Sequence, residues 1–302
     1  MKFLLTGGTG FVGKPLVNKL LEAGHSVVLL SSRPQMAKNM FQDKIEAYYW
    51  KSTETLPPVD AFKDVDAVIN LAGENISNKR WTSDQKQKIY ESRILTTRHL
   101  MQCLETLPQK IKVVVSTSAI GIYGDRPGEF LAESSTVGGG FLANVCEHWE
   151  REVLKKSSAV DRTVILRVGV VLGKGGGMIE KLLPPFKLGA GGPIGNGKQF
   201  MSWIHLNDLV DLYIFAATSS MNGIYNAVST PVTNARFTEA FGKALHRPAF
   251  FTVPPIALKI MMGGMSALAL DNQKIVSERL RIDGYEFKFP KIENALEDIV
   301  KK

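Results

Sequence analysis

The chain has 302 residues, of which 44% are hydrophobic and 22% are charged, a composition that is ordinary for a globular protein with a sizeable core. Its net charge is +8, but the densest basic stretch, residues 78–93, also contains acids and matches no nucleic-acid motif, so we expect no nucleic-acid partner. Neither the two cysteines nor the five histidines have the spacing of metal ligands, which argues against a bound metal.

No segment is typical of a signal peptide or a membrane span. The N-terminus has only a short apolar run before glycines intervene. The least polar segment, residues 254–270, is too short to cross a bilayer and contains Lys259, so we expect a buried or substrate-facing helical region. These features predict a cytoplasmic protein with no membrane partner, in which Cys103 and Cys146 are free thiols.

Short β-branched runs alternate with helical patterns along the first half of the chain, as in a parallel sheet wrapped by helices. A long helix is expected from its N-cap at about Ser83 to about Leu107, before Pro108. The predicted strands cover residues 2–7, 26–32, 46–50, 66–73, 112–119 and 163–171.

After Gly173 the pattern changes, because nine glycines and three prolines lie between residues 173 and 199. This composition predicts long loops around a short helix, of the kind that covers a ligand. A strand-like segment then leads into a helix capped by Asn207 or Asp208, and another helix is expected over 234–245.

We therefore predict an α/β protein with two parts. Residues 1–172 form a Rossmann domain with a doubly wound parallel sheet, to which 200–222 return. Residues 173–199 and 223–302 form a smaller C-terminal lobe that covers the substrate.

Three phosphate-binding patterns overlap in TGGTGFVGKP, residues 6–15. The Walker A pattern fails because Pro15 stands where the Mg²⁺-binding Ser or Thr belongs, and GPIGNGKQ at 192–199 fails in the same way. The dinucleotide pattern has its strand before and its helix after the glycines, so the loop is expected to hold a pyrophosphate at the helix N-terminus. The residues concerned are Gly7, Gly10, Phe11, Val12 and Gly13.

The end of the second strand indicates which dinucleotide binds. An acidic residue there would hold the ribose 2′-hydroxyl of NAD, but the sequence has Ser31, Ser32 and Arg33. Since arginine suits a phosphate, we predict NADP(H), with Ser32 and Arg33 at the 2′-phosphate.

Long motifs resemble the extended short-chain dehydrogenase/reductase superfamily: TGGTGFVG, NLAG at 70–73, STSAIGIYG at 116–124 and WIHLNDLV at 203–210. With RVGVVLGKGGG at 167–177, the chain resembles one atypical subgroup, the "epimerase family" proteins related to nucleotide-sugar epimerases, which carry a C-terminal domain of unknown function.

The resemblance implies further cofactor contacts. Leu71, Ala72 and Gly73 would lie on the adenosine side, and Lys88 and Arg93 would reach the cofactor phosphates, although both charges also suit a helix surface. The nicotinamide end would be flanked by loops that include Ser116, Thr117, Ser118, Arg167 and Val171.

One departure from the superfamily concerns the chemistry. Leu142 and Cys146 occupy the slots of its Tyr-x-x-x-Lys pair, in which tyrosine transfers the proton and lysine lowers its pKa. Ser118 and Tyr123 are the candidate replacements, and Tyr123 could equally be a packing residue. A buried structural thiol is the expected role of Cys146.

Two functions remain open from the sequence. One is an NADP(H)-dependent oxidoreductase or epimerase-like enzyme, a monomer or homodimer, acting on an unknown small carbonyl or alcohol. Phe186, Phe200, Met201 and Trp203 suggest a substrate less polar than a sugar, or simply a core. The other is a sensor that binds NADP(H) without chemistry.

Overall fold

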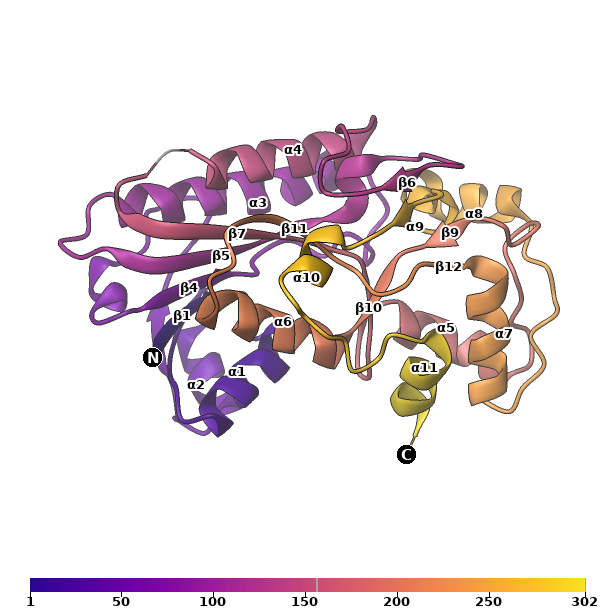
Figure 1. Ribbon diagram of the computed structural model, residues 1–302, viewed down its shortest axis with the longest axis horizontal. Coiled ribbons are helices and arrows are strands. Elements are labelled where there is room, and N and C mark those ends of the chain that lie inside the picture. Colours follow the sequence, from indigo (N-terminus) through magenta and orange to yellow (C-terminus); the bar gives the residue numbers. More distant parts are fainter. Residues whose placement is uncertain (156, 302) are drawn as a thin grey trace.

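The computed structural model describes residues 1–155 and 157–301. A seven-stranded parallel sheet forms its larger part (Figure 1), with the strand order β11-β7-β5-β4-β1-β2-β3. The predicted fold class is therefore confirmed. The strands are β1 (Lys2–Thr6), β2 (Ser26–Ser31), β3 (Glu46–Tyr49), β4 (Ala67–Asn70), β5 (Ile111–Ala119), β7 (Val160–Val168) and β11 (Gly223–Ala227).

Helices cover both faces of the sheet because the inner strands are apolar on both sides. Leu5 and Ile69 join the core beneath α1, α2 and α6, whereas Leu4 and Val68 join a second core beneath α3. Figure 1 shows α3 and α4 on one face and α1, α2 and α6 on the other. Their bounds are α1 (Gly13–Glu22), α2 (Pro34–Met40), α3 (Ser83–Leu104), α4 (Phe141–Val153) and α6 (Leu206–Thr218).

The C-terminal lobe has a core of its own, in which Phe186, Phe237 and Phe241 pack with Trp203 and Leu296. Three helices surround this core: α5 (Gly177–Lys187), α7 (Asn234–Ala244) and α11 (Ile292–Val300). Short strands link the lobe to the sheet domain: β6 (Phe130–Leu131) with β13 (Lys274–Ile275), β8 (Val170–Leu172) with β10 (Trp203–His205), and β9 (Phe200–Met201) with β12 (Val232–Thr233). The remaining elements are η1 (Val59–Phe62), η2 (Ile120–Tyr123), α8 (Pro255–Met262), η3 (Gly263–Ser266), α9 (Ala267–Leu270) and α10 (Glu278–Ile282).

Three predicted boundaries are wrong. The lobe was expected to begin again at residue 223, but residues 223–227 are β11, the edge strand paired with β7. The long helix ends at Leu104, and its N-cap is Thr82 rather than Ser83, because the Thr82 side chain accepts a hydrogen bond from the Gln85 N–H.

The caps predicted for α6 are also wrong. His205 is the N-cap, and its Nδ1 accepts a hydrogen bond from the Asn207 N–H. The Asp208 carboxylate instead accepts the backbone N–H groups of Lys288 and Phe289, which ties the C-terminal segment to the sheet domain.

The apolar segment 254–270 is not a buried helix. It forms α8, η3 and α9, and no residue of α8 is buried. Of the two expectations for this segment, only the substrate-facing one remains open.

Candidate functional site

The glycine-rich loop joins β1 to α1 at the carboxyl edge of the sheet, where ligands of open parallel sheets bind. Gly7 has φ +68° and lies close to the residue that follows β4: a Cβ atom on Gly7 would be 2.9 Å from the Leu71 carbonyl carbon. A Cβ atom on Gly13 would be 2.7 Å from Gly8 Cα. Within the described chain the backbone N–H groups of Phe11 and Val12 make no hydrogen bond. These donors and the helix N-terminus suit a pyrophosphate.

Thr6 and Asn70 hold the loop after β4 beside the glycines. The Thr6 hydroxyl accepts the N–H groups of Leu71 (3.2 Å) and Ala72 (3.1 Å) and donates to Asn70 Oδ1 at 2.6 Å. The backbone of 71–73 is therefore fixed at the edge where the resemblance places the adenosine side of the cofactor.

Arg93 lies under that same loop. A Cβ atom on Gly73 would be 3.0 Å from the Arg93 guanidinium carbon, and Arg93 Nη1 donates to the carbonyl oxygens of Glu74 and Ile89. Lys88 is exposed on α3, as a helix-surface charge would be.

The end of β2 carries no acid. Ser32 and Arg33 are exposed, and the Arg33 N–H donates to Ser31 Oγ at 3.0 Å, which turns the chain into α2. In the part of the chain that the structure describes, the Arg33 guanidinium has no ion-pair partner, so its donors are available to an anion.

Residues 116–118, expected in a loop, lie in β5 just before its last residue, and their side chains and that of Arg167 at the end of β7 are bonded inside the protein. Ser118 Oγ donates to Glu150 Oε1 at 2.6 Å, and Arg167 forms a bidentate ion pair with the Glu150 carboxylate at 2.9 and 2.8 Å. Thr117 bonds the Tyr213 hydroxyl at 2.6 Å, and Ser116 is fully buried. The side chains of Ser118 and Arg167 are therefore engaged inside the protein.

Tyr123 belongs to the same buried network. It is 0% exposed, its hydroxyl donates to Asn226 Oδ1 at 2.7 Å, and it accepts a hydrogen bond from Arg167 Nη1 at 2.9 Å. Burial raises the pKa of the hydroxyl, against the opposite effect of Arg167. This geometry favours the packing role for Tyr123, and Ser118 is committed to Glu150 in the same way.

Leu142 and Cys146 lie beside the loop that follows β5. A Cβ atom on Gly121 would be 3.1 Å from Leu142 Cβ and 3.9 Å from Cys146 Sγ. The two slots of the superfamily's catalytic pair therefore stand next to the carboxyl end of β5, where the nicotinamide end is expected. Burial raises the pKa of Cys146 to about 12.

We expect the folded protein to resist alkylation by iodoacetamide at pH 8. Cys103 and Cys146 are both buried, and burial raises the pKa of both thiols, so the reactive thiolate is scarce. Mass spectrometry should find no label at either cysteine without denaturant and two labels in 6 M guanidinium chloride. Rapid labelling of Cys146 in the native state would contradict its burial.

The C-terminal lobe reaches back over the glycine-rich loop. A Cβ atom on Gly176 would be 2.5 Å from the Phe11 ring, and the Lys181 ammonium on α5 donates to the backbone oxygen and hydroxyl of Ser77. Val171 is half-buried between these regions, in the strand that leads to α5. The cofactor loops are thus bounded by the sheet domain on one side and α5 on the other.

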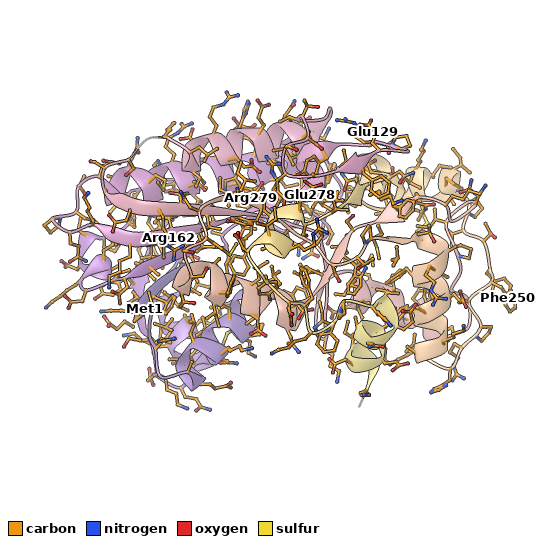
Figure 2. All side chains as sticks on the ribbon, viewed as in Figure 1. Met1, Glu129, Arg162, Phe250, Glu278 and Arg279 are labelled. Atoms are coloured by element: carbon orange, nitrogen blue, oxygen red, sulfur yellow. The ribbon has the colours of Figure 1, made fainter. Side chains whose placement is uncertain are left out.

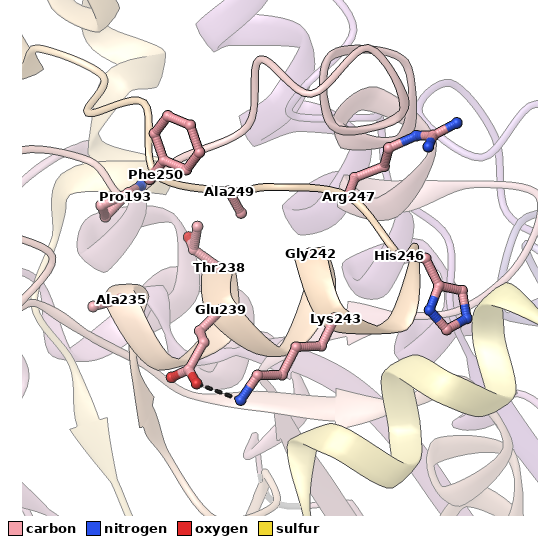
Figure 3. Close-up of a pocket in the computed structure, with 10 residues that line it drawn as sticks. All are labelled: Pro193, Ala235, Thr238, Glu239, Gly242, Lys243, His246, Arg247, Ala249 and Phe250. Atoms are coloured by element: carbon pink, nitrogen blue, oxygen red, sulfur yellow. Dashed lines mark hydrogen bonds and ion pairs between the residues drawn. The ribbon is translucent and has the colours of Figure 1, made fainter.

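A groove of about 660 Å³ lies elsewhere, at the outer side of α7 (Figure 3). Glu239 and Lys243 are ion-paired at 2.6 Å along it, and Phe250 stands at the outer end of the lobe (Figure 2). None of its lining residues comes from a strand end of the large sheet, so we do not place the functional site there.

Several supporting residues had no clear signal in the sequence. The Thr6–Asn70 pair and the Phe11–Gly176 contact join segments distant in the chain. The Trp81–Phe141 contact joins two segments in the same way, with ring centroids 5.3 Å apart. Of these residues, only Asn70 had a signal in the sequence, because it is a polar residue at the end of a buried strand.

The fold and the carboxyl edge of the large sheet define a doubly wound α/β protein. It has the strand, glycine-rich turn and helix of dinucleotide-binding proteins. The chain belongs to the NAD dependent epimerase/dehydratase family, whose model matches residues 3–227, and a domain of unknown function matches residues 253–299.

Similar proteins match over nearly the whole chain. Epimerase family protein SDR39U1 of Bos taurus is 36% identical over 99% of this chain and 100% of its own length. A chloroplastic homologue in Arabidopsis thaliana is 35% identical, over 100% of this chain and 87% of its own. The crystal structure of human SDR39U1 with NADPH has a TM-score of 0.89 at 34% identity and covers 99% of both chains.

Among the residues that the structure describes, no helix is long and apolar enough to span a membrane. No group of three or more His, Cys, Asp or Glu side chains in the described ranges could hold a metal ion.

Proposed function

We propose that this protein is an NADP(H)-dependent oxidoreductase acting on a weakly polar carbonyl compound. The observation that carries the proposal is the glycine cradle at β1 together with the exposed, unpaired Arg33 at an acid-free β2 end. The human relative crystallised with NADPH, 34% identical to this chain, supports the same cofactor.

The residues present fit that cofactor. The backbone of Phe11 and Val12 and the N-terminus of α1 would bind the pyrophosphate, and Ser32 and Arg33 would bind the 2′-phosphate. Leu71 to Gly73 would border the adenosine side. The bound cofactor supplies a hydride at the nicotinamide ring.

The residues of the chain would bind and orient the cofactor and the substrate and exclude water from them. They would supply no proton. Leu142 offers no acid where the superfamily has tyrosine, and Cys146 has a buried thiol with a pKa of about 12. The hydroxyl groups of Ser118 and Tyr123 donate to Glu150 and Asn226 inside the protein. The proton that completes a reduction would therefore come from water.

Arg33→Ala should weaken NADPH binding about tenfold to hundredfold and leave NADH binding unchanged, because charge-assisted hydrogen bonds to a phosphate contribute about 1.5–3 kcal/mol. Isothermal titration with each cofactor measures the ratio of the two affinities.

Arg151→Ala is the matched control, since Arg151 is exposed on α4 and paired with Glu147. It should keep the preference for NADPH. Equal binding of NADH and NADPH by the unaltered protein would refute the proposed 2′-phosphate site.

Tyr123→Phe should leave turnover within about twofold of the unaltered enzyme, because the hydroxyl faces Asn226 and Arg167 and not the strand-end edge. The assay follows NADPH absorbance with a panel of aldehydes, ketones, quinones and nucleotide sugars.

The remaining outcomes separate the alternatives. Loss of turnover in Tyr123→Phe, with NADPH binding intact, would make that residue the acid. NADPH binding without turnover on any substrate would favour the sensor, which the lack of a Tyr-x-x-x-Lys pair also supports.

A further inference from the structure

We infer that the substrate is a planar, conjugated carbonyl compound of the quinone or enone class, held against Trp81, Phe141 and Leu142 and facing the Arg93 guanidinium. The inference rests on the proposed function and names its substrate class. Three features of the site carry it: an apolar wall, the lack of a protein acid, and a cation with unused donors.

The apolar wall runs from the C-terminal lobe to the end of β5. A Cβ atom on Gly264 of η3 would be 3.5 Å from the Trp81 ring, and that ring meets Phe141 edge-on at 5.3 Å. Leu142 follows Phe141 and touches Gly121, and all three wall side chains are partly exposed.

The polar group of the wall is the indole N–H of Trp81, and it already has a hydrogen-bond partner. Trp81 Nε1 donates to the Ile76 carbonyl oxygen at 2.8 Å, so the ring presents carbon atoms to a ligand. The three wall side chains offer no partner to the hydroxyl groups of a sugar ring, whereas a flat π-system would stack on them.

The lack of an acid selects among carbonyl compounds. Hydride addition to an isolated ketone creates an alkoxide, a strong base that needs an acid close by. A quinone takes the hydride of NADPH and becomes a hydroquinone monoanion, whose charge is spread over the ring; it then takes one proton from water. The balance is one quinone, one NADPH and one proton in, and one hydroquinone and one NADP⁺ out.

In this proposal Arg93 faces that delocalised anion, in place of the cofactor phosphates that the resemblance implies for it. Its Nη1 is bonded to Glu74 and Ile89, while Nε and Nη2 have no hydrogen-bond partner in the described ranges. Burial lowers the pKa of Arg93, which lies near Glu74 and near Cys146, the residue in the slot of the missing lysine. A desolvated guanidinium gains from meeting an anion that forms only during the reaction.

The first test is steady-state turnover at saturating NADPH with 2-methyl-1,4-naphthoquinone, cyclohexanone and UDP-glucose. We expect kcat/KM for the naphthoquinone to exceed that for cyclohexanone by about 100-fold or more. Phe141→Ser should lower the naphthoquinone value about tenfold at unchanged NADPH affinity, and Phe250→Ser, on the far end of the lobe, should not change it.

Arg93→Met should lower kcat more than it raises KM, by about 10- to 100-fold, and Arg93→Lys should restore part of the rate. A second readout needs no turnover: the naphthoquinone should quench tryptophan fluorescence of the NADP⁺-loaded protein, and Trp81→Phe should remove most of this quenching.

Failure of the inference and failure of the proposed function give different results. Preferred turnover of cyclohexanone or UDP-glucose, or quenching that survives Trp81→Phe, would overturn the substrate class while the oxidoreductase stands. Quenching through Trp81 without NADPH oxidation would overturn the oxidoreductase and leave a quinone-binding protein.

Discussion

Gly13→Ala should raise the dissociation constant of NADPH by about 100-fold or more, the equivalent of about 2.7 kcal/mol. The new Cβ atom would press on the Gly7 carbonyl oxygen and lie 2.7 Å from Gly8 Cα, both of them backbone atoms that no rotamer change can move. The loop would have to open, and the donors that cradle the pyrophosphate would lose their alignment. Titration of NADPH by its fluorescence measures the effect.

Gly139→Ala is a matched control for that substitution. A Cβ atom there meets nothing within 4 Å, so both affinity and thermal midpoint should stay near those of the unaltered protein. Circular dichroism of both variants separates a local effect on the loop from unfolding. Unchanged NADPH affinity in a folded Gly13→Ala protein would contradict the cradle.

The glycine loop was predictable because its signal is local. Strand, glycines and helix follow one another within residues 2–22, and steric limits on the backbone make glycine the residue that fits. The apolar strands were predictable for a similar reason, because a strand that is buried on both faces has a nearly continuous run of apolar, often β-branched residues in its sequence.

What failed were features decided by distant partners. Asp208 resembles a helix cap in sequence. In the structure its carboxylate accepts hydrogen bonds from the backbone N–H groups of Lys288 and Phe289, which are 80 residues or more away in the chain. The strand at 223–227 was assigned to the lobe because nothing in its own residues says that it pairs with β7. The apolar segment near residue 256 suggested burial, and its exposure depends on how the lobe packs.

The candidate acids show the same limit. The sequence suggested Ser118 and Tyr123 as acids near the carboxyl end of β5, but only the three-dimensional network shows that Glu150, Arg167 and Asn226 bond their hydroxyl groups. Arg167, expected beside the nicotinamide end, anchors this network with its side chain.

Glu150→Ala should lower the free energy of unfolding by about 3–5 kcal/mol, because it leaves the Arg167 guanidinium buried without its counter-ion. Arg167 is 6% exposed and Glu150 is 5% exposed, so neither charge is screened by water. In the unaltered protein burial lowers the pKa of Arg167, while the hydrogen bonds and charge of Glu150 raise it further. The cation persists in the variant without Glu150, because an arginine guanidinium is not deprotonated in proteins. Urea denaturation followed by circular dichroism measures the loss.

Glu147→Ala on the same helix is the control, since its ion pair with Arg151 is exposed and should contribute less than about 1 kcal/mol. The double variant Glu150→Leu with Arg167→Met should recover part of the lost stability, because it removes both buried charges and keeps most of the packed volume. Equal destabilisation by Glu150→Ala and Glu147→Ala would mean that the buried pair does not stabilise the junction of β5, β7 and α4. A double variant as stable as the unaltered protein would show that the ion pair fixes the geometry of this edge and adds nothing to stability.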